Sequence, residues 1–371
     1  CGGGKIKAEA FYEGKLVGEA QRNAKGAFSF VMPLSELHLW EVGCGRLYDI
    51  TITMGEDKVE SYFGMRSVGF DGFKFLLNGK SVFQRLVLDH GFYPDGVYTA
   101  PSDDALAADI KASMSFGFNG ARLHQKVFEP RFLYHADRLG YMVWGETGNW
   151  GLDHTLSDAI YNFLPEWLEE VERDFSHPSV IGWCPTNETW DRHGRQQFNP
   201  FLDSIYDITK AIDKTRPVIT SSGSYPTERT DVHDVHDYEQ DPEKFRSYYS
   251  EIENGIVRDQ IQRKSPRRQI SKTNLPIFVS EYGGTQWVDA EKNAGWGYGQ
   301  APIDEQEFKY RFKGLSEAIL FHPNMGGLCY TQLTDVEQEV NGLYTYEREA
   351  KFDPAFFRSV LEQTAAIEKD V

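Results

Sequence analysis

The stretch Val180-Ile181-Gly182-Trp183-Cys184 is a short apolar run that ends in the polar turn Pro185-Thr186-Asn187-Glu188. A run this short and this apolar is typical of a strand that is buried on both faces of a parallel sheet. Seven further runs of the same kind lie along the chain: 82–88, 118–123, 141–145, 217–221, 232–236, 276–280 and 326–333. The sequence therefore predicts eight buried strands.

Helical patterns lie between most of these runs. In residues 103–116, Leu106, Ile110 and Met114 recur every four positions, and Gly117 follows. Strands that alternate with helices predict a parallel α/β sheet, and eight such units close a (β/α)8 TIM barrel. An open doubly wound sheet is the alternative, but the chain has no GxGxxG motif after an early strand.

The first part of the chain shows a different pattern. Runs 27–32 and 47–54 are rich in β-branched and aromatic residues and are separated by turns. We expect a small immunoglobulin-like β-sandwich over residues 1–66, although about 60 residues is short for a complete one. A hairpin is predicted to follow across Asn78-Gly79, with the barrel over residues 67–371.

Composition excludes several classes of protein. The 371 residues carry 39 basic and 56 acidic side chains, a net charge of −17, which disfavours binding to nucleic acid. No window approaches the ~20 continuous apolar residues of a membrane span. The 4 cysteines form no CxxC pair, so we expect neither a zinc site nor a disulfide framework. The chain opens on Cys1-Gly2-Gly3-Gly4, and we expect the natural protein to extend further.

Barrel enzymes place their working groups where the strands end. Polar residues stand at these positions after nearly every predicted strand: Asp89, His90, Arg122, His124, Glu146, Asn187, Glu188, Ser222, His236, Asp237, Tyr238 and Glu281. Glu188 and Glu281 follow strands four and seven, which lie across the barrel mouth from each other. Two facing carboxyl groups are the machinery of glycoside hydrolysis, at ~5–5.5 Å in retaining enzymes and ~6.5–9.5 Å in inverting ones. Pairing of either one with Arg122 or His236 for structure alone is the alternative.

Two motifs carry a resemblance. Pro185-Thr186-Asn187-Glu188-Thr189-Trp190 and Val279-Ser280-Glu281-Tyr282-Gly283-Gly284 resemble the active-site motifs of glycoside hydrolase family 2. That family contains β-galactosidases, β-glucuronidases and β-mannosidases. The passage Tyr62-Phe63-Gly64-Met65-Arg66 also looks like the family's entry from an immunoglobulin-like domain into its barrel.

The resemblance implies roles for single residues. It makes Glu188 the general acid/base, with a raised pKa, and Glu281 the nucleophile of a double displacement. It implies that Asn187 binds the sugar 2-hydroxyl, that Tyr238 lies beside the nucleophile, and that Arg122 keeps Glu281 charged. The reaction implied is that of a retaining exo-β-glycosidase, β-galactosidase-like, acting on an oligosaccharide or glycoside without cofactor or metal.

The sequence also departs from the family pattern. Leu88-Asp89-His90-Gly91 stands where the family has Asn-Arg-His-Glu, Arg122-Leu123-His124-Gln125 shifts a histidine by one position, and Tyr330 replaces a tryptophan. These positions line the sugar subsite. An Asn-x-Lys motif, which holds the carboxylate in glucuronidases, does not follow Glu281, and this disfavours glucuronides. A β-mannosidase and an inactive carbohydrate-binding fragment stay open.

Several other features leave alternatives. Trp150, Trp190, Trp287 and Trp296 fall in loops, where such rings are more often loop core than sugar platforms; Trp287 and Tyr330 are taken as substrate-binding candidates. His233-x-x-His236-Asp237 resembles half of a metal site, but hydrogen bonding is the favoured role. The basic run 258–272 is expected to be a solvated surface. A homo-oligomer, and a periplasmic, secreted or cytoplasmic location, all stay open.

Overall fold

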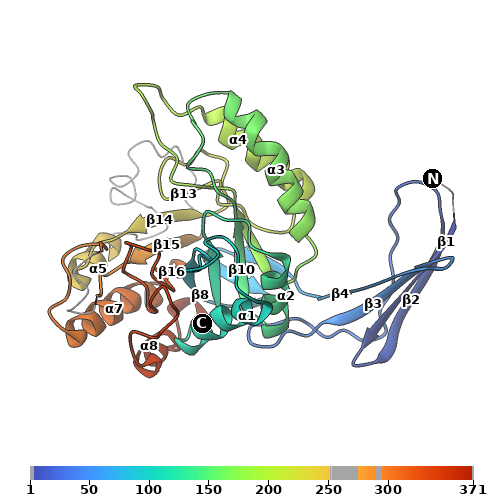
Figure 1. Ribbon diagram of the computed structural model, residues 1–371, viewed down its shortest axis with the longest axis horizontal. Coiled ribbons are helices and arrows are strands. Elements are labelled where there is room, and N and C mark those ends of the chain that lie inside the picture. Colours follow the sequence, from blue (N-terminus) through green and yellow to red (C-terminus); the bar gives the residue numbers. More distant parts are fainter. Residues whose placement is uncertain (1–3, 251, 253–274, 289–294, 370–371) are drawn as a thin grey trace.

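The protein was analysed as a computed structural model, which describes all residues except 1–3, 251, 253–274, 289–294 and 370–371. Its centre is a curled parallel sheet of seven strands in the order β11-β10-β9-β8-β16-β15-β14 (Figure 1). These strands are β8 (Gln84–Asp89), β9 (Gly120–Leu123), β10 (Met142–Glu146), β11 (Val180–Cys184), β14 (His233–Asp237), β15 (Ile277–Gly283) and β16 (Met325–Thr331). Each coincides with a predicted apolar run, so the α/β parallel sheet is confirmed.

The predicted fifth strand is less regular and does not belong to the seven-stranded sheet. Residues 217–222 lie beside β11, where Trp183 N donates to Pro217 O and Ile219 N donates to Trp183 O, both at 2.9 Å. Within this segment, β13 (Ser221–Ser222) pairs with β12 (Thr186–Asn187). On its other side, this segment is joined to β14 through a side chain, because Gly223 N donates to Asp234 Oδ2 at 2.7 Å.

Helices follow the strands and cover the outside of the sheet (Figure 1). They are α1 (Asp103–Ser115), α2 (Pro130–Leu139), α3 (Asp158–Asp174), α4 (Asn199–Ile212), α5 (Pro242–Ser250), α7 (Glu305–Leu320) and α8 (Pro354–Leu361), with a final 3-10 turn η2 (Ala366–Glu368). The sequence explains their ends. Ser102 caps α1 by accepting from Ala105 N at 3.2 Å, and Gly140 ends α2 with a φ of 68°. None of the described helices is long and apolar enough to cross a membrane.

Side chains along each strand alternate between two hydrophobic cores, one inside the barrel and one between the sheet and the helices. In β8, Leu86 and Leu88 pack inside the barrel, and Val87 packs outward against the helices. In β10, Trp144 points inward and Val143 outward in the same way. Since side chains of a strand alternate between faces, the polar residues Arg122 and Glu146 also fall on the inner face.

The N-terminal part forms one antiparallel sheet that extends away from the barrel (Figure 1). Its strands are β1 (Gly4–Tyr12), β2 (Lys15–Ala24), β3 (Tyr48–Met54) and β4 (Asp57–Phe63), in the order β2-β1-β3-β4. Residues 27–32 form no strand, contrary to the prediction: Val31 is 87% exposed and buries little apolar surface. An immunoglobulin-like sandwich needs two packed sheets, and it is not confirmed by the described residues.

A small hairpin sheet connects this part to the barrel. It consists of β5 (Val68–Asp71), β6 (Lys74–Leu77) and β7 (Lys80–Ser81). Asn78 and Gly79 have φ values of 54° and 77°, as the predicted type I′ turn requires. Arg66 fixes the junction, because its Nη2 donates to Val180 O at 2.7 Å.

Candidate active site

A cleft of about 560 Å³ opens where the parallel strands end. Three carboxylates reach it, those of Glu188, Glu281 and Glu339. Aromatic rings form much of the rest of its wall: Phe92, Tyr98, Trp150, Tyr238, Trp296 and Tyr298. Flat rings beside a few polar groups are the surface that a sugar ring requires.

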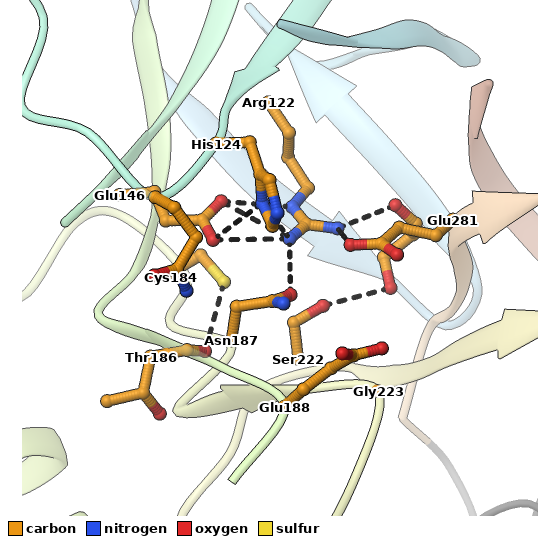
Figure 2. Close-up of polar contacts among 12 residues, drawn as sticks. Arg122, His124, Glu146, Cys184, Thr186, Asn187, Glu188, Ser222, Gly223 and Glu281 are labelled. Atoms are coloured by element: carbon orange, nitrogen blue, oxygen red, sulfur yellow. Dashed lines mark hydrogen bonds and ion pairs between the residues drawn. The ribbon is translucent and has the colours of Figure 1, made fainter. Parts of the chain in front are cut away.

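Arg122 on β9 organises the floor of this cleft. Figure 2 shows its guanidinium between the carboxylates of Glu146 and Glu281, with Asn187 beneath it. Its Nη2 lies 3.2 Å from Glu146 Oε2, and its Nη1 lies 3.2 Å from Glu281 Oε1. Burial lowers the pKa of Arg122, but the charges of Glu146 and Glu281 outweigh burial and raise it. The guanidinium is therefore a fixed positive charge beside the carboxylate of Glu281.

Asn187 is held in one orientation by the same guanidinium. Arg122 Nη2 donates to Asn187 Oδ1 at 2.8 Å, and Asn187 N donates to Asn149 Oδ1 at 2.8 Å. Asn187 Nδ2 is buried and has no hydrogen-bond partner among the described residues, although Asn187 itself lines the cleft. A buried donor without a partner is costly, so this amide is prepared to donate to a ligand.

The two carboxylates predicted from the sequence do come together. Oxygens of Glu188 and Glu281 lie within 4.8 Å of each other and of a ring nitrogen of His236. His236 Nδ1 is 2.8 Å from Glu188 Oε1 and 3.2 Å from Glu281 Oε2. Among the described residues this is the group whose spacing suits a metal ion, and the His233-x-x-His236-Asp237 motif contributes His236 to it. Its members also pair with one another through His236 Nδ1.

The pKa of Glu188 differs from the expectation. Burial raises the pKa of this carboxyl, but the hydrogen bond from His236 and its charge outweigh burial and lower it. The reverse holds for His236: burial lowers its pKa, and the charges of Glu281 and Glu188 together raise it. The predicted rise for Glu188 overlooked a cation at 2.8 Å.

Tyr238 lies beside Glu281, as the resemblance implies. Its hydroxyl donates to Glu281 Oε2, and its ring stacks on that of Tyr298 with centroids 3.4 Å apart. Burial and the charge of Glu281 raise the pKa of Tyr238 well above its ordinary value. The phenol therefore stays protonated and acts as a donor to this carboxylate.

Two histidines, His90 and His124, form the neighbouring wall, and the buried Glu146 pairs with one of them. His124 Nδ1 lies 3.1 Å from Glu146 Oε1, and its ring meets that of His90 edge to face at 4.7 Å. Burial, with the charge of His124, lowers the pKa of His90 well below its ordinary value. His90 is thus neutral, and its buried Nδ1 has no partner among the described residues.

Four of the predicted site residues lie outside the cleft: Asp89, Asp237, Trp287 and Tyr330. Asp89 accepts from Gly91 N at 2.9 Å and Asp237 accepts from Tyr249 Oη at 2.9 Å, so both brace loops. Trp287 packs against Phe308 and Phe352 in the core. Tyr330 packs outward among Tyr282 and Phe312, because alternation along β16 directs the next residue, Thr331, to the cleft.

Sequence reasoning also missed some cleft residues. Trp150 and Trp296 line the cleft and are 50% and 49% exposed, so loop core is the wrong assignment for them. Trp190 packs edge to face on Trp150, with centroids 6.3 Å apart. Tyr298 and Thr331 belong to no motif recognised in the sequence. The alternation of side chains along β16 would have identified Thr331. The basic run 258–272 lies entirely outside the described residues.

The chain is similar to known glycosidases. Among curated proteins, the chain is 26% identical over 258 residues to a β-galactosidase of Alteromonas mediterranea, covering 66% of this chain and 23% of that protein. It is 27% identical over 274 residues to a β-galactosidase of Thermoanaerobacterium thermosulfurigenes, covering 70% and 34%. The chain thus spans well under half of these relatives.

Solved structures share the fold. A β-glucuronidase from Ruminococcus gnavus in complex with D-glucuronic acid superposes with a TM-score of 0.76 at 18% identity, over 97% of this chain and 63% of that one. The β-glucuronidase of Bifidobacterium dentium gives 0.79 at 17% identity, over 96% and 60%.

A family model decides the assignment. The model for "Glycosyl hydrolases family 2, TIM barrel domain" matches residues 69–290, more than half of the chain. This chain belongs to glycoside hydrolase family 2.

Proposed function

We propose that this protein is a retaining exo-β-glycosidase with residues 67–371 as its catalytic domain. The observation that carries the proposal is the approach of Glu188 and Glu281 to within 4.8 Å. Carboxyl groups at ~5–5.5 Å suit a double displacement, whereas an inverting enzyme needs ~6.5–9.5 Å for a water between them. Glu281 is the nucleophile, and Glu188 is the general acid/base.

The surroundings support these roles. Arg122 and the Tyr238 hydroxyl both bind Glu281, and these contacts direct its oxygens. Glu188 is more accessible, with its side chain 33% exposed against 5% for Glu281. An acid that must reach a leaving group at the open end of the cleft needs such exposure. Asn187 Nδ2 is placed to bind the sugar 2-hydroxyl.

The charge of the cleft favours a neutral sugar. Among the described residues that line it, none is Lys or Arg, and three are carboxylates. A uronic acid would bring a negative charge into this site without a cation to bind it. A terminal β-galactoside is the proposed substrate, in agreement with the β-galactosidases that the chain resembles. A β-mannoside is the second candidate, because the charge of the cleft separates neutral from acidic sugars but does not select one neutral sugar over another.

The test is hydrolysis of a panel of p-nitrophenyl β-glycosides: galactoside, mannoside, glucoside and glucuronide. We expect turnover of a neutral sugar, with the glucuronide at least about 100-fold slower. The anomeric proton of the first product, followed by NMR, should show the β configuration. An α product would contradict the double displacement. Binding of galactose without turnover of any glycoside would instead favour a carbohydrate-binding protein.

A further inference from the structure

His236 occupies a position that the roles above do not explain. It is 8% exposed and lies between the acid/base and the nucleophile, with the single atom Nδ1 facing both. That atom is 2.8 Å from Glu188 Oε1 and 3.2 Å from Glu281 Oε2. Two carboxylate oxygens at these distances require a proton on Nδ1 or on one of the oxygens.

The other ring nitrogen is fixed by a second set of contacts. His236 Nε2 lies 2.9 Å from Ser222 Oγ, and this hydroxyl donates to Asp234 Oδ2 at 2.9 Å. Because a hydroxyl has one proton, Ser222 then faces the ring with a lone pair, and Nε2 must donate to it. With Ser222 donating to Asp234, Nε2 keeps its proton, and Nδ1 is the nitrogen that gains and loses one.

We propose that His236 is a positioning residue that holds, at rest, the proton which Glu188 delivers to the leaving group. The inference rests on the proposed function and deepens it. Before bond cleavage the proton passes from Nδ1 to Glu188 Oε1. Glu188 then protonates the glycosidic oxygen as the bond from that oxygen to C1 breaks and Glu281 bonds to C1.

The second half of the reaction returns the proton. Glu188, now a carboxylate, takes a proton from the water that attacks C1, and the bond from C1 to Glu281 breaks. The proton then passes from Glu188 back to Nδ1. Each cycle uses one water and leaves the protein unchanged. While Glu281 is esterified it carries no charge, so His236 faces one carboxylate fewer and binds its proton less tightly.

The charges around the ring agree with a proton stored there. The groups that face His236 come from several elements: Arg122 on β9, Glu188 after β12, Ser222 on β13, Asp234 on β14, Tyr238 after β14 and Glu281 on β15. Burial and Arg122 lower the pKa of His236, but Glu281 and Glu188 outweigh them and raise it. The same contact lowers the pKa of Glu188.

The first test is the pH dependence of kcat/KM for His236→Asn, which keeps an amide donor toward Glu188 but binds no proton. The alkaline limit is the pH above which activity on a β-glycoside with an alkyl leaving group is lost. If the proton prefers Nδ1 over Glu188 by tenfold or more, this limit should fall by about one pH unit or more in the variant. Activity on the 2,4-dinitrophenyl glycoside should change less than about threefold. His322→Asn, outside the cleft, is the control and should leave the limit in place.

Two outcomes would overturn the proposal. An unchanged alkaline limit would mean that His236 only supports the structure. A limit that moves to higher pH would mean that His236 acts as a fixed cation that lowers the pKa of Glu188 without supplying its proton.

A second measurement needs no turnover, so it separates this inference from the proposed function. In the ¹⁵N-labelled full chain, the His236 ring signals, assigned by their loss in His236→Asn, should titrate with a midpoint above about 6.5. Glu188→Gln should lower that midpoint. A ring that is neutral at pH 6, or a midpoint that ignores Glu188→Gln, would refute the proton store even if the enzyme hydrolyses glycosides.

Discussion

Arg122 Nη2 donates to Asn187 Oδ1 at 2.8 Å, and this bond decides which end of the Asn187 amide faces the cleft. The oxygen is used by Arg122, so the NH2 group is the end left for a ligand. The same guanidinium binds Glu281, so the donor for the sugar and the proposed nucleophile are positioned by one side chain.

The first prediction concerns this amide. Asn187→Ala should lower kcat/KM on the substrate by about 100-fold or more, because a bond to the 2-hydroxyl strengthens in the transition state. On the 2-deoxy analogue, which lacks that hydroxyl, the same variant should lose far less. Steady-state kinetics on both substrates check this. Equal losses on the two would show that Asn187 acts through the fold.

Glu188 should be needed only where the leaving group needs a proton. Glu188→Ala should lower kcat/KM about 10²–10⁴-fold on an alkyl glycoside and much less on the 2,4-dinitrophenyl glycoside. Added azide should restore turnover and yield a β-glycosyl azide. Glu166→Ala, at an exposed position, serves as the control. A similar loss on both substrates would assign the acid role to another residue.

Arg122 should matter for stability as well as for catalysis. Arg122→Met leaves the carboxylates of Glu146 and Glu281 buried without their cation, and loss of one partner from such a group costs about 3–5 kcal/mol. The exposed pair of Arg131 and Asp103 offers a control, for which Arg131→Met should cost about 0–1 kcal/mol. Urea unfolding measures both values. A cost no larger than that of the control would contradict the central place of Arg122.

The raised pKa of Asp89 predicts that the stability of the fold depends on pH. Burial, with the charge of Asp109, raises its pKa to about 7, whereas an unfolded aspartate titrates near 3.9. The folded state therefore holds a proton that the unfolded state releases. The stability from this proton is complete below about pH 4 and is lost as the pH rises through about 7.

Asp89→Asn removes this pH-dependent contribution to the stability of the fold. Its Tm should fall less between pH 5 and pH 8 than that of the wild type, as measured by thermal unfolding at several pH values. Asp71→Asn, which removes the same charge at an exposed position, should follow the wild type. If both variants follow the wild type, Asp89 titrates normally in the fold.

Much of this molecule could be predicted from local pattern. The eight apolar runs predict the strands because a strand buried on both faces has to be apolar along its length. The two acidic residues could be placed at the barrel mouth because parallel strands share one carboxyl edge. The hairpin at Asn78-Gly79 follows from the backbone angles of its turn.

The predictions that failed concern contacts between segments that are distant in the sequence. Pairing of Glu188 with His236 was an alternative that the sequence left open, and the raised pKa expected for Glu188 did not include it; with His236 Nδ1 at 2.8 Å from Glu188 Oε1, the pKa is lowered instead. Tyr330 was assigned to the cleft because it stands where the family has a tryptophan, but its position in the alternation along β16 directs it outward. Trp150 and Trp296 lie in irregular loops, whose paths no periodicity defines.

The most direct test of the central claim, that Glu281 bonds to the sugar, is trapping of the glycosyl-enzyme. The chain is incubated with 2-deoxy-2-fluoro-β-galactosyl fluoride, and in parallel with the mannosyl analogue, then digested and analysed by mass spectrometry. The account predicts one fluorosugar per chain on the peptide that carries Glu281, and none in Glu281→Gln. A label on another residue, or inactivation that survives Glu281→Gln, would contradict it.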